Sequence, residues 1–120
     1  MKVFEVNDKR FNVSLELFFE GQYFNFNDVS FHLNKEAETL DIYVVSKWQL
    51  DNLTEQRAWE EIKRGENTYD YLVASSKEFA ELVKPYKLRF SVIEDYGNGS
   101  FEVCYLSNNK LVWKQSDPQF

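Results

Sequence analysis

Few side chains of this 120-residue sequence have the chemistry of a catalytic or metal centre. His32 is the single histidine and Cys104 is the single cysteine. Catalysis by a nucleophile needs an adjacent base, and a structural zinc site needs four ligands, most often Cys and His. No stretch has the acidic spacing of a calcium loop, and Gly97-Asn98-Gly99 lacks the Lys and hydroxyl residue of a phosphate loop. We therefore predict no catalytic residue, no metal site and no cofactor, and we expect the protein not to be an enzyme.

Carboxylates mixed with aromatic rings form the other candidate site. They lie on the polar side of the strands expected before residue 48 and in the turns that connect those strands, Asp28 among them. Acidic side chains steer a basic partner toward a surface, and rigid aromatic side chains supply contact area. We therefore predict a partner-binding site formed by Glu16, Phe18, Glu20, Tyr23, Glu36, Glu38, Asp41 and Tyr43.

Simpler interpretations of these residues stay open. The acidic and aromatic side chains also fit a solvated sheet face with ordinary solubility charge. His32 is expected at the surface, because its parity is opposite to that of the apolar residues beside it, and Cys104 is expected to be a small buried hydrophobe. Carboxylates can hydrolyse substrates unaided, as in glycosidases. However, Glu60-Glu61 fits a solvated helix face and Glu94-Asp95 fits the approach to a turn.

The charge of the sequence narrows the class of partner. Its 20 acidic and 14 basic residues give a net charge of −6, and residues 1–60 hold 11 of the acids and 6 of the bases. Phosphate binding needs clustered Lys and Arg, so we predict a basic protein partner and no nucleic acid. No stretch is long and apolar enough to cross a membrane, and one cysteine cannot form an internal disulfide. We expect a cytoplasmic monomer or weak dimer with no membrane partner.

The first third of the chain has the alternation of a β-meander. In residues 10–20 every second residue is apolar, which predicts one strand with a single buried face. The alternation resumes at residues 24–26 and again, with the opposite parity, at residues 29–33. We therefore expect a bulge or a short turn at Asn27-Asp28. Residues 40–48, rich in β-branched and aromatic side chains, predict the next strand, and residues 3–6 are a candidate edge strand.

A first helix is expected after these strands. Asn52 and Glu55 have the spacing of a capping box, in which each side chain bonds a free backbone N–H of the first turn. This box predicts a helix over residues 53–64 that stops at Gly65, because glycine suits the left-handed residue after a helix. Residues 66–74 fit either a helix or an extended chain.

A second helix is expected directly before the last strands. Ser75 and Glu78 form a further capping box, which predicts a helix over residues 76–84. Pro85 ends this helix, because the residue before proline avoids the helical conformation. Phe79, with other apolar residues of the same helix, is expected to face the core.

The last third of the chain predicts three more strands. Residues 87–96 and 100–106 flank Gly97-Asn98-Gly99, a turn sequence, and a second turn precedes residues 111–114. The whole chain, residues 1–120, therefore predicts one α+β domain in the order ββββααβββ. We expect an antiparallel β-meander, two central helices and a C-terminal three-stranded β-meander.

The complete profile is that of a binding protein. A short acidic α+β chain without active-site residues resembles, by size and charge, the immunity proteins that neutralise bacterial toxins. We predict a bacterial or phage inhibitor that occludes the basic active-site cleft of a toxin, with nuclease effectors as candidates because they hold nucleic acid in cationic clefts. A phage-encoded inhibitor of a host defence protein fits the same profile. The alternatives from other classes are an assembly subunit and a small-ligand-binding or enzymatic domain with an aromatic-lined pocket.

Overall fold

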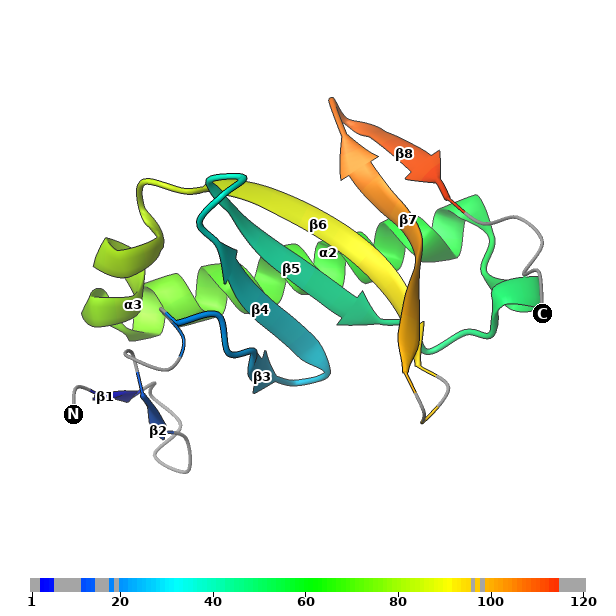
Figure 1. Ribbon diagram of the computed structural model, residues 1–120. Coiled ribbons are helices and arrows are strands. Elements are labelled where there is room, and N and C mark those ends of the chain that lie inside the picture. Colours follow the sequence, from blue (N-terminus) through cyan, green and yellow to red (C-terminus); the bar gives the residue numbers. More distant parts are fainter. Residues whose placement is uncertain are drawn as a thin grey trace.

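A six-stranded mixed β-sheet with two helices against one face forms the body of the protein (Figure 1). The computed structural model describes residues 3–5, 12–14, 18, 20–95, 97 and 99–114, the first two stretches by their backbone alone. A separate two-stranded sheet lies near the N-terminus. The strands are β1 Val3–Glu5, β2 Asn12–Ser14, β3 Phe24–Phe26, β4 Val29–Asn34, β5 Thr39–Val45, β6 Lys87–Asp95, β7 Ser100–Ser107 and β8 Lys110–Trp113.

One parallel pair joins the two halves of the large sheet, whose strand order is β3-β4-β5-β6-β7-β8. β5 and β6 run parallel, with Ile42 beside Phe90, whereas every other neighbouring pair is antiparallel. A parallel pair needs a long crossover connection, and the helices supply it. The predicted α+β class is confirmed. The predicted order ββββααβββ and the purely antiparallel arrangement are wrong, because five strands precede the helices and the two meanders merge edge to edge.

The strand predicted over residues 10–20 is confirmed at residues 12–14 but does not extend to Phe18, and residues 10, 11, 15–17 and 19 lie outside the described residues. β2 ends at Ser14 and pairs with β1 in the small sheet, and Phe18 has a helical conformation. The Phe18 side chain is 1% exposed and packs against the rings of Phe24 and Phe79, at centroid distances of 6.1 and 6.3 Å. Two consecutive phenylalanines cannot both lie on one face of a strand, so the alternation placed Phe18 on the polar side. A turn brings it into the core instead.

Two hairpin turns use residues with positive φ. Asn27 (52°) and Asp28 (60°) connect β3 to β4, and Asn108 (51°) and Asn109 (64°) connect β7 to β8. Two-residue turns of this kind match the twist of the flanking strands, and Asn and Asp tolerate the left-handed conformation best after glycine. The expected interruption at Asn27-Asp28 is therefore a tight turn. It reverses the chain, which explains the change of parity seen in the sequence.

The first helix, α2 (Glu55–Ser75), is longer than predicted and follows a short 3-10 helix, η1 (Leu50–Asn52). Its N-cap is Thr54, whose hydroxyl accepts a hydrogen bond from the Arg57 N–H, and not Asn52. Gly65 lies within the helix and does not end it. A Cβ on Gly65 would stand 2.6 Å from Cγ2 of Val44, so glycine here permits close approach of the helix to the sheet. The ambiguous residues 66–74 are helical.

The second helix, α3 (Lys77–Val83), begins one residue later than predicted. Its N-cap is Ser76, whose hydroxyl accepts from the Phe79 N–H at 3.1 Å, so the capping residue is Ser76 rather than Ser75. The helix stops before Pro85, as the sequence predicts. Within the described residues no helix is long and apolar enough to span a bilayer.

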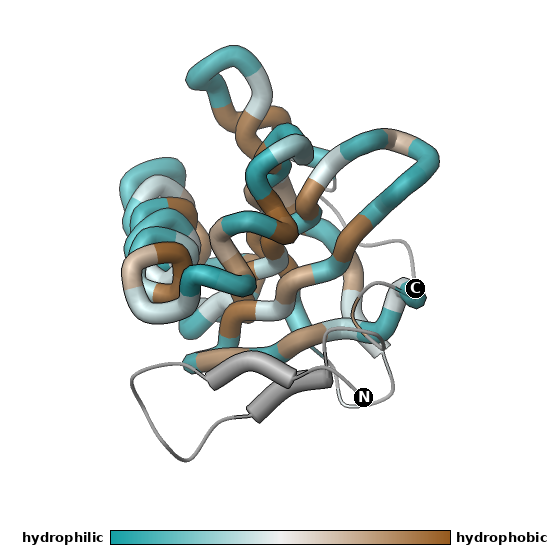
Figure 2. Tube along the Cα trace, turned by 90° about the vertical axis from the view of Figure 1, so that its left-hand side faces the viewer, coloured by the Kyte–Doolittle hydropathy of each residue, from teal (hydrophilic) through white to brown (hydrophobic). Residues whose placement is uncertain are grey.

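The core lies between the helices and one face of the sheet. Hydrophobic residues gather in the middle of the molecule, and hydrophilic residues follow the connecting loops (Figure 2). The alternate residues of β4, β5 and β6 on this face are almost all inaccessible to solvent, as are the inward residues of α2 and α3. The largest fully buried side chains are Phe18, Phe31, Phe79, Leu40, Ile42, Ile62 and Leu72.

Candidate functional site

The face of the large sheet opposite α2 and α3 carries polar residues in register across the strands. His32 of β4 stands opposite Asp41 of β5, which stands beside Arg89 of β6. In the next row Tyr43 lies between Ser30 and Ser91. We call this surface the open face. Its polar character follows from the alternation of each strand, since the neighbouring residues point into the core.

Asp41 is the most deeply buried acid of the open face, at 5% exposure. Its carboxylate accepts a hydrogen bond from the Thr39 hydroxyl at 2.7 Å and a longer one from the Tyr43 hydroxyl at 3.5 Å. Nδ1 of His32 lies 3.9 Å from the second carboxylate oxygen, and the His32 ring stacks on Tyr23 with centroids 4.7 Å apart. Burial and the Asp41 charge raise the pKa of Tyr43 to about 12. Asp41 therefore stabilises the open face through its hydrogen bonds with Thr39 and Tyr43.

A bidentate ion pair joins β6 to β7 on the same face. The Arg89 guanidinium donates to both oxygens of Glu102, at 2.7 and 3.1 Å, and its Cζ atom lies 4.4 Å from the Tyr105 ring centroid. The Ser91 hydroxyl donates to Glu102 at 2.6 Å, and Lys114 Nζ lies 3.6 Å away. Burial disfavours the charge of Glu102, but the hydrogen bonds from Arg89 and Ser91 outweigh it, so the pKa of Glu102 is lowered.

A β-bulge turns Glu102 toward this cluster. Val92 pairs with Cys104, whereas Ile93 pairs with Glu102, so β7 has one extra residue, Val103, at this point. Without the extra residue, Glu102 would pair with Glu94 and face the helices. Bulges redirect side chains in this way. The ion pair with Arg89 could not be foreseen from the sequence, because it depends on this register.

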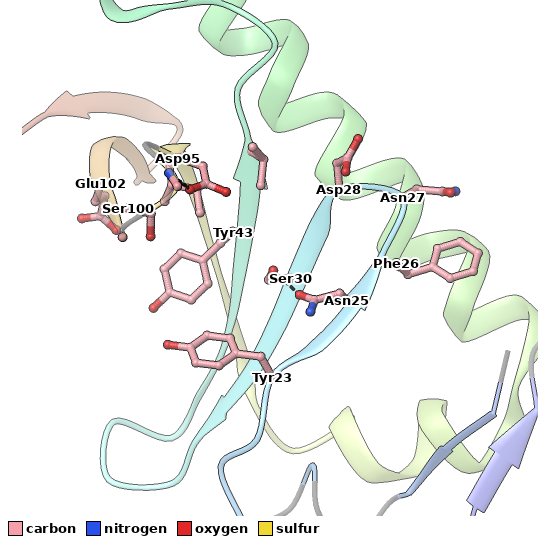
Figure 3. Close-up of a pocket in the computed structure, with 14 residues that line it drawn as sticks. Tyr23, Asn25, Phe26, Asn27, Asp28, Ser30, Tyr43, Asp95, Ser100 and Glu102 are labelled. Carbon is pink, nitrogen blue, oxygen red and sulfur yellow. Dashed lines mark hydrogen bonds between the residues drawn. The ribbon is translucent and has the colours of Figure 1, made fainter.

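A groove of about 1160 Å³ lies across the open face, between the β3–β4 turn and the start of β7 (Figure 3). Tyr23 and Tyr43 stand side by side at one end, with ring centroids 6.2 Å apart. Val45 and Ile93, neighbours on β5 and β6, are the aliphatic side chains of the lining. Among the described residues that line the groove, the charged ones are all carboxylates, namely Asp28, Asp95 and Glu102.

Arg64 of α2 forms hydrogen bonds with the backbone of two residues that line the groove. Its guanidinium donates to the backbone oxygens of Val45 at 2.6 Å and Asn27 at 3.3 Å, both groove residues. The 4%-exposed Glu61 accepts from Arg64 and from the Lys47 N–H, at 3.0 and 2.8 Å. The expectation that Glu60-Glu61 forms a solvated helix face is therefore wrong for Glu61, because its carboxylate ties the helix to the end of β5.

The structure separates the eight residues of the predicted partner-binding site. Phe18 is in the core and Asp41 is buried, which corrects their expected exposure. Glu16 lies outside the described residues. The remaining acids, Glu20, Glu36 and Glu38, are exposed, but Glu36 and Glu38 belong to the β4–β5 turn, at the far end of β4 from the groove.

Two of the eight residues do meet in the groove, together with acids outside that set. Tyr23 is 59% exposed and Tyr43 is half-buried, and both line the groove. Asp28, an acid that the sequence placed in a connecting turn, joins them. Asp95 was expected to be plain turn charge, yet it also lines the groove. Its position directly before a glycine-rich turn was the one signal available from sequence.

His32 and Cys104 do not form a catalytic pair. Cys104 is buried on the helix side of β7, whereas His32 lies on the open face. Burial, with a smaller contribution from Glu102, raises the pKa of the Cys104 thiol to about 11, which disfavours the nucleophilic thiolate. Among the described residues no group of three or more His, Cys, Asp or Glu side chains could hold a metal ion. The carboxylates that line the groove suit the binding of a cationic group.

Comparison of the chain with protein-family models, with curated proteins and with solved structures gave no match. The open face is a concave, acidic, partly aromatic surface on a rigid sheet, and these properties define a candidate binding site.

Proposed function

We propose that the protein is a non-catalytic binding protein whose groove receives a basic segment of a protein partner. The observation that carries this proposal is the lining of the groove, in which Asp28, Asp95 and Glu102 are acidic and none of the other described residues is basic. The net charge of −6 adds a long-range attraction for a basic partner. Tyr23, more than half exposed at the end of the groove, offers a rigid aromatic contact.

The biological role we propose is that of an immunity protein that inhibits a basic toxin. Asp28 lies in the β3–β4 turn and Asp95 is the last residue of β6, so the two acids lie at the ends of two hairpins that border the groove. Such turns fit a cationic cleft, while the groove takes a segment at the rim of that cleft. A nuclease toxin would be blocked sterically, because its cleft must stay open for nucleic acid. A host defence protein with a basic cleft is the alternative partner.

Charge reversal with a matched control tests the binding proposal. Asp28→Lys with Asp95→Lys changes the groove, whereas Glu66→Lys with Glu81→Lys makes the same change of net charge on the exposed side of the helices. A fluorescein-labelled nona-arginine peptide is the probe, and fluorescence polarisation at two salt concentrations is the measurement. We expect the groove variant to bind at least about tenfold more weakly than the helix variant, because local charge outweighs net charge at short range. Equal losses in the two variants would overturn the proposal.

Co-expression tests the immunity role separately. Each product of the genes that flank the coding sequence is expressed with and without this protein, and growth is measured. We expect one flanking product to arrest growth, and the wild type and the helix variant to restore it. The groove variant should not restore it. An arrest that the groove variant also relieves, or no arrest by any flanking product, would contradict the immunity role and leave the binding experiment to stand by itself.

A further inference from the structure

The floor of the groove has an order of chemical properties that goes beyond its net charge. Asp28 is level with Val45, since the Val45 N–H donates to the Asp28 backbone oxygen at 3.0 Å. Val45 is level with Ile93 on the neighbouring parallel strand. Asp95 lies two residues further along β6. The groove therefore runs from a carboxylate, over two half-buried aliphatic side chains, to a second carboxylate.

Both outer carboxylates are available for a partner. Asp95 accepts one short hydrogen bond, from the Gly97 N–H at 2.8 Å, and is otherwise exposed. Asp28 is exposed in its turn, and no ion pair joins either acid to a described Lys or Arg. Glu102 differs, because Arg89 and Ser91 already occupy its oxygens. The two outer acids thus define the charged ends of the groove.

The spacing of the strands sets the distance between these two acids. Asp28 and Asp95 are separated by two strand spacings of about 4.8 Å and by two residues along β6, at about 3.3 Å per residue. Their Cα atoms therefore lie roughly 12 Å apart. An extended peptide advances about 3.3 Å per residue, so this distance corresponds to roughly four residues. A segment that crosses the strands can then place an apolar side chain over Val45 and Ile93 between its two cations.

We infer that the groove recognises a segment of its protein partner with two cationic residues about four positions apart and an apolar residue midway between them. The cations meet Asp28 and Asp95, and the apolar residue packs on Val45 and Ile93. The inference rests on the proposed function, and it adds a sequence pattern to what was a charge preference. Burial of one apolar side chain then discriminates between segments of equal charge.

Three pentapeptides test the pattern against isotope-labelled protein by NMR titration at low salt. Arg-Gly-Leu-Gly-Arg has the inferred pattern, Arg-Gly-Ser-Gly-Arg lacks the apolar residue, and Arg-Arg-Leu-Gly-Gly has adjacent cations. We expect the first peptide to bind about tenfold more tightly than the other two, because a buried leucine side chain favours binding by this order. The largest shifts should occur at Val45 and Ile93. Equal affinities, or shifts confined to other residues, would overturn the inference.

Variants of the apolar floor separate the inference from the proposed function. Ile93→Thr should lower the affinity for Arg-Gly-Leu-Gly-Arg to that for the serine peptide. Val45→Thr serves as a second variant with the same expectation if Ile93→Thr does not fold. Val112→Thr is the matched control, since Val112 is an exposed aliphatic residue of β8 outside the groove. Spermidine is a further probe, and binding as tight as that of the first peptide would assign the groove to a polyamine instead.

The possible failures are distinguishable. If nona-arginine binding depends on Asp28 and Asp95 but Arg-Gly-Leu-Gly-Arg binds no more tightly than the other pentapeptides, the inferred pattern is wrong and the binding proposal stands. If nona-arginine binding does not depend on these acids, both are wrong. If the leucine peptide is preferred and Ile93→Thr removes that preference, both are supported.

Discussion

Gly65 of α2 and Val44 of β5 are in direct contact across the helix–sheet interface. A Cβ at position 65 would stand 2.6 Å from Cγ2 of Val44, closer than any ordinary carbon contact. Phe90 and Ile42 limit the space further, at 3.5 and 3.7 Å. This contact sets the depth at which α2 lies on the sheet. It therefore also positions Arg64, the preceding residue, against the backbone of the groove.

Gly65→Ala tests this contact. Alanine normally stabilises a helix by about 1 kcal/mol relative to glycine, but overpacking a rigid core costs about 1–3 kcal/mol. Val44 is β-branched and fully buried, so it cannot rotate away, and we expect a net loss of up to about 2 kcal/mol in the free energy of unfolding. Urea denaturation measures it. Val44→Ala in the Gly65→Ala background should recover part of the loss, whereas a stabilised single variant would show that the helix is further from the sheet.

Phe18→Ala tests the position of Phe18 in the core. The side chain is fully buried among aromatic rings, so its loss should cost about 3–5 kcal/mol of stability. Tyr23→Ala is the control, because Tyr23 is 59% exposed and should cost under about 1 kcal/mol. Thermal and urea unfolding of both variants give the comparison. Similar losses would mean that Phe18 faces solvent, as the alternation of the sequence had predicted.

Acid should weaken the protein through Glu102. Because the folded-state pKa of Glu102 is lowered, its ionised form is favoured by folding, and this contribution is complete above the unfolded pKa. The contribution is lost as the pH falls through the lower folded pKa. We expect Glu102→Gln to be less stable than the wild type at pH 7 and to show a flatter loss of stability below pH 4.5, the ordinary value. Parallel pH profiles of the two proteins would contradict the ion pair with Arg89.

High pH should lower the stability of the protein through Tyr43. Its pKa is raised from 10.0 to about 12, so the folded state holds the neutral hydroxyl while the unfolded state releases the proton. The contribution of Tyr43 to stability is therefore complete below pH 10 and is lost between pH 10 and 12. Absorbance at 295 nm should lose one late tyrosine ionisation in Tyr43→Phe, whereas Tyr69, whose pKa is also raised by burial, should keep its own late ionisation. Asp41→Asn should move the Tyr43 ionisation to lower pH, and an unchanged late phase in Tyr43→Phe would contradict the assignment.

Local patterns determined much of the secondary structure from the sequence alone. Alternation identified the strands of the large sheet, because a strand with one buried face must alternate. The residues that tolerate positive φ marked the turns at Asn27-Asp28 and at Asn108-Asn109, and Pro85 marked the end of α3. These features depend on residues that are neighbours in the chain.

Tertiary contacts decided the rest. Gly65 has the sequence signal of a helix end, yet the proximity of Val44 makes it a packing residue within α2. Phe18 fell on the polar side of the predicted alternation, yet it packs in the core against Phe24 and Phe79. The groove itself depends on the parallel pairing of β5 with β6 and on the bulge in β7, which bring Asp28, Asp95 and Glu102 together from positions up to 74 residues apart. Periodicity within one segment carries no information on such pairing, because register is set by long-range packing and not by neighbours in sequence.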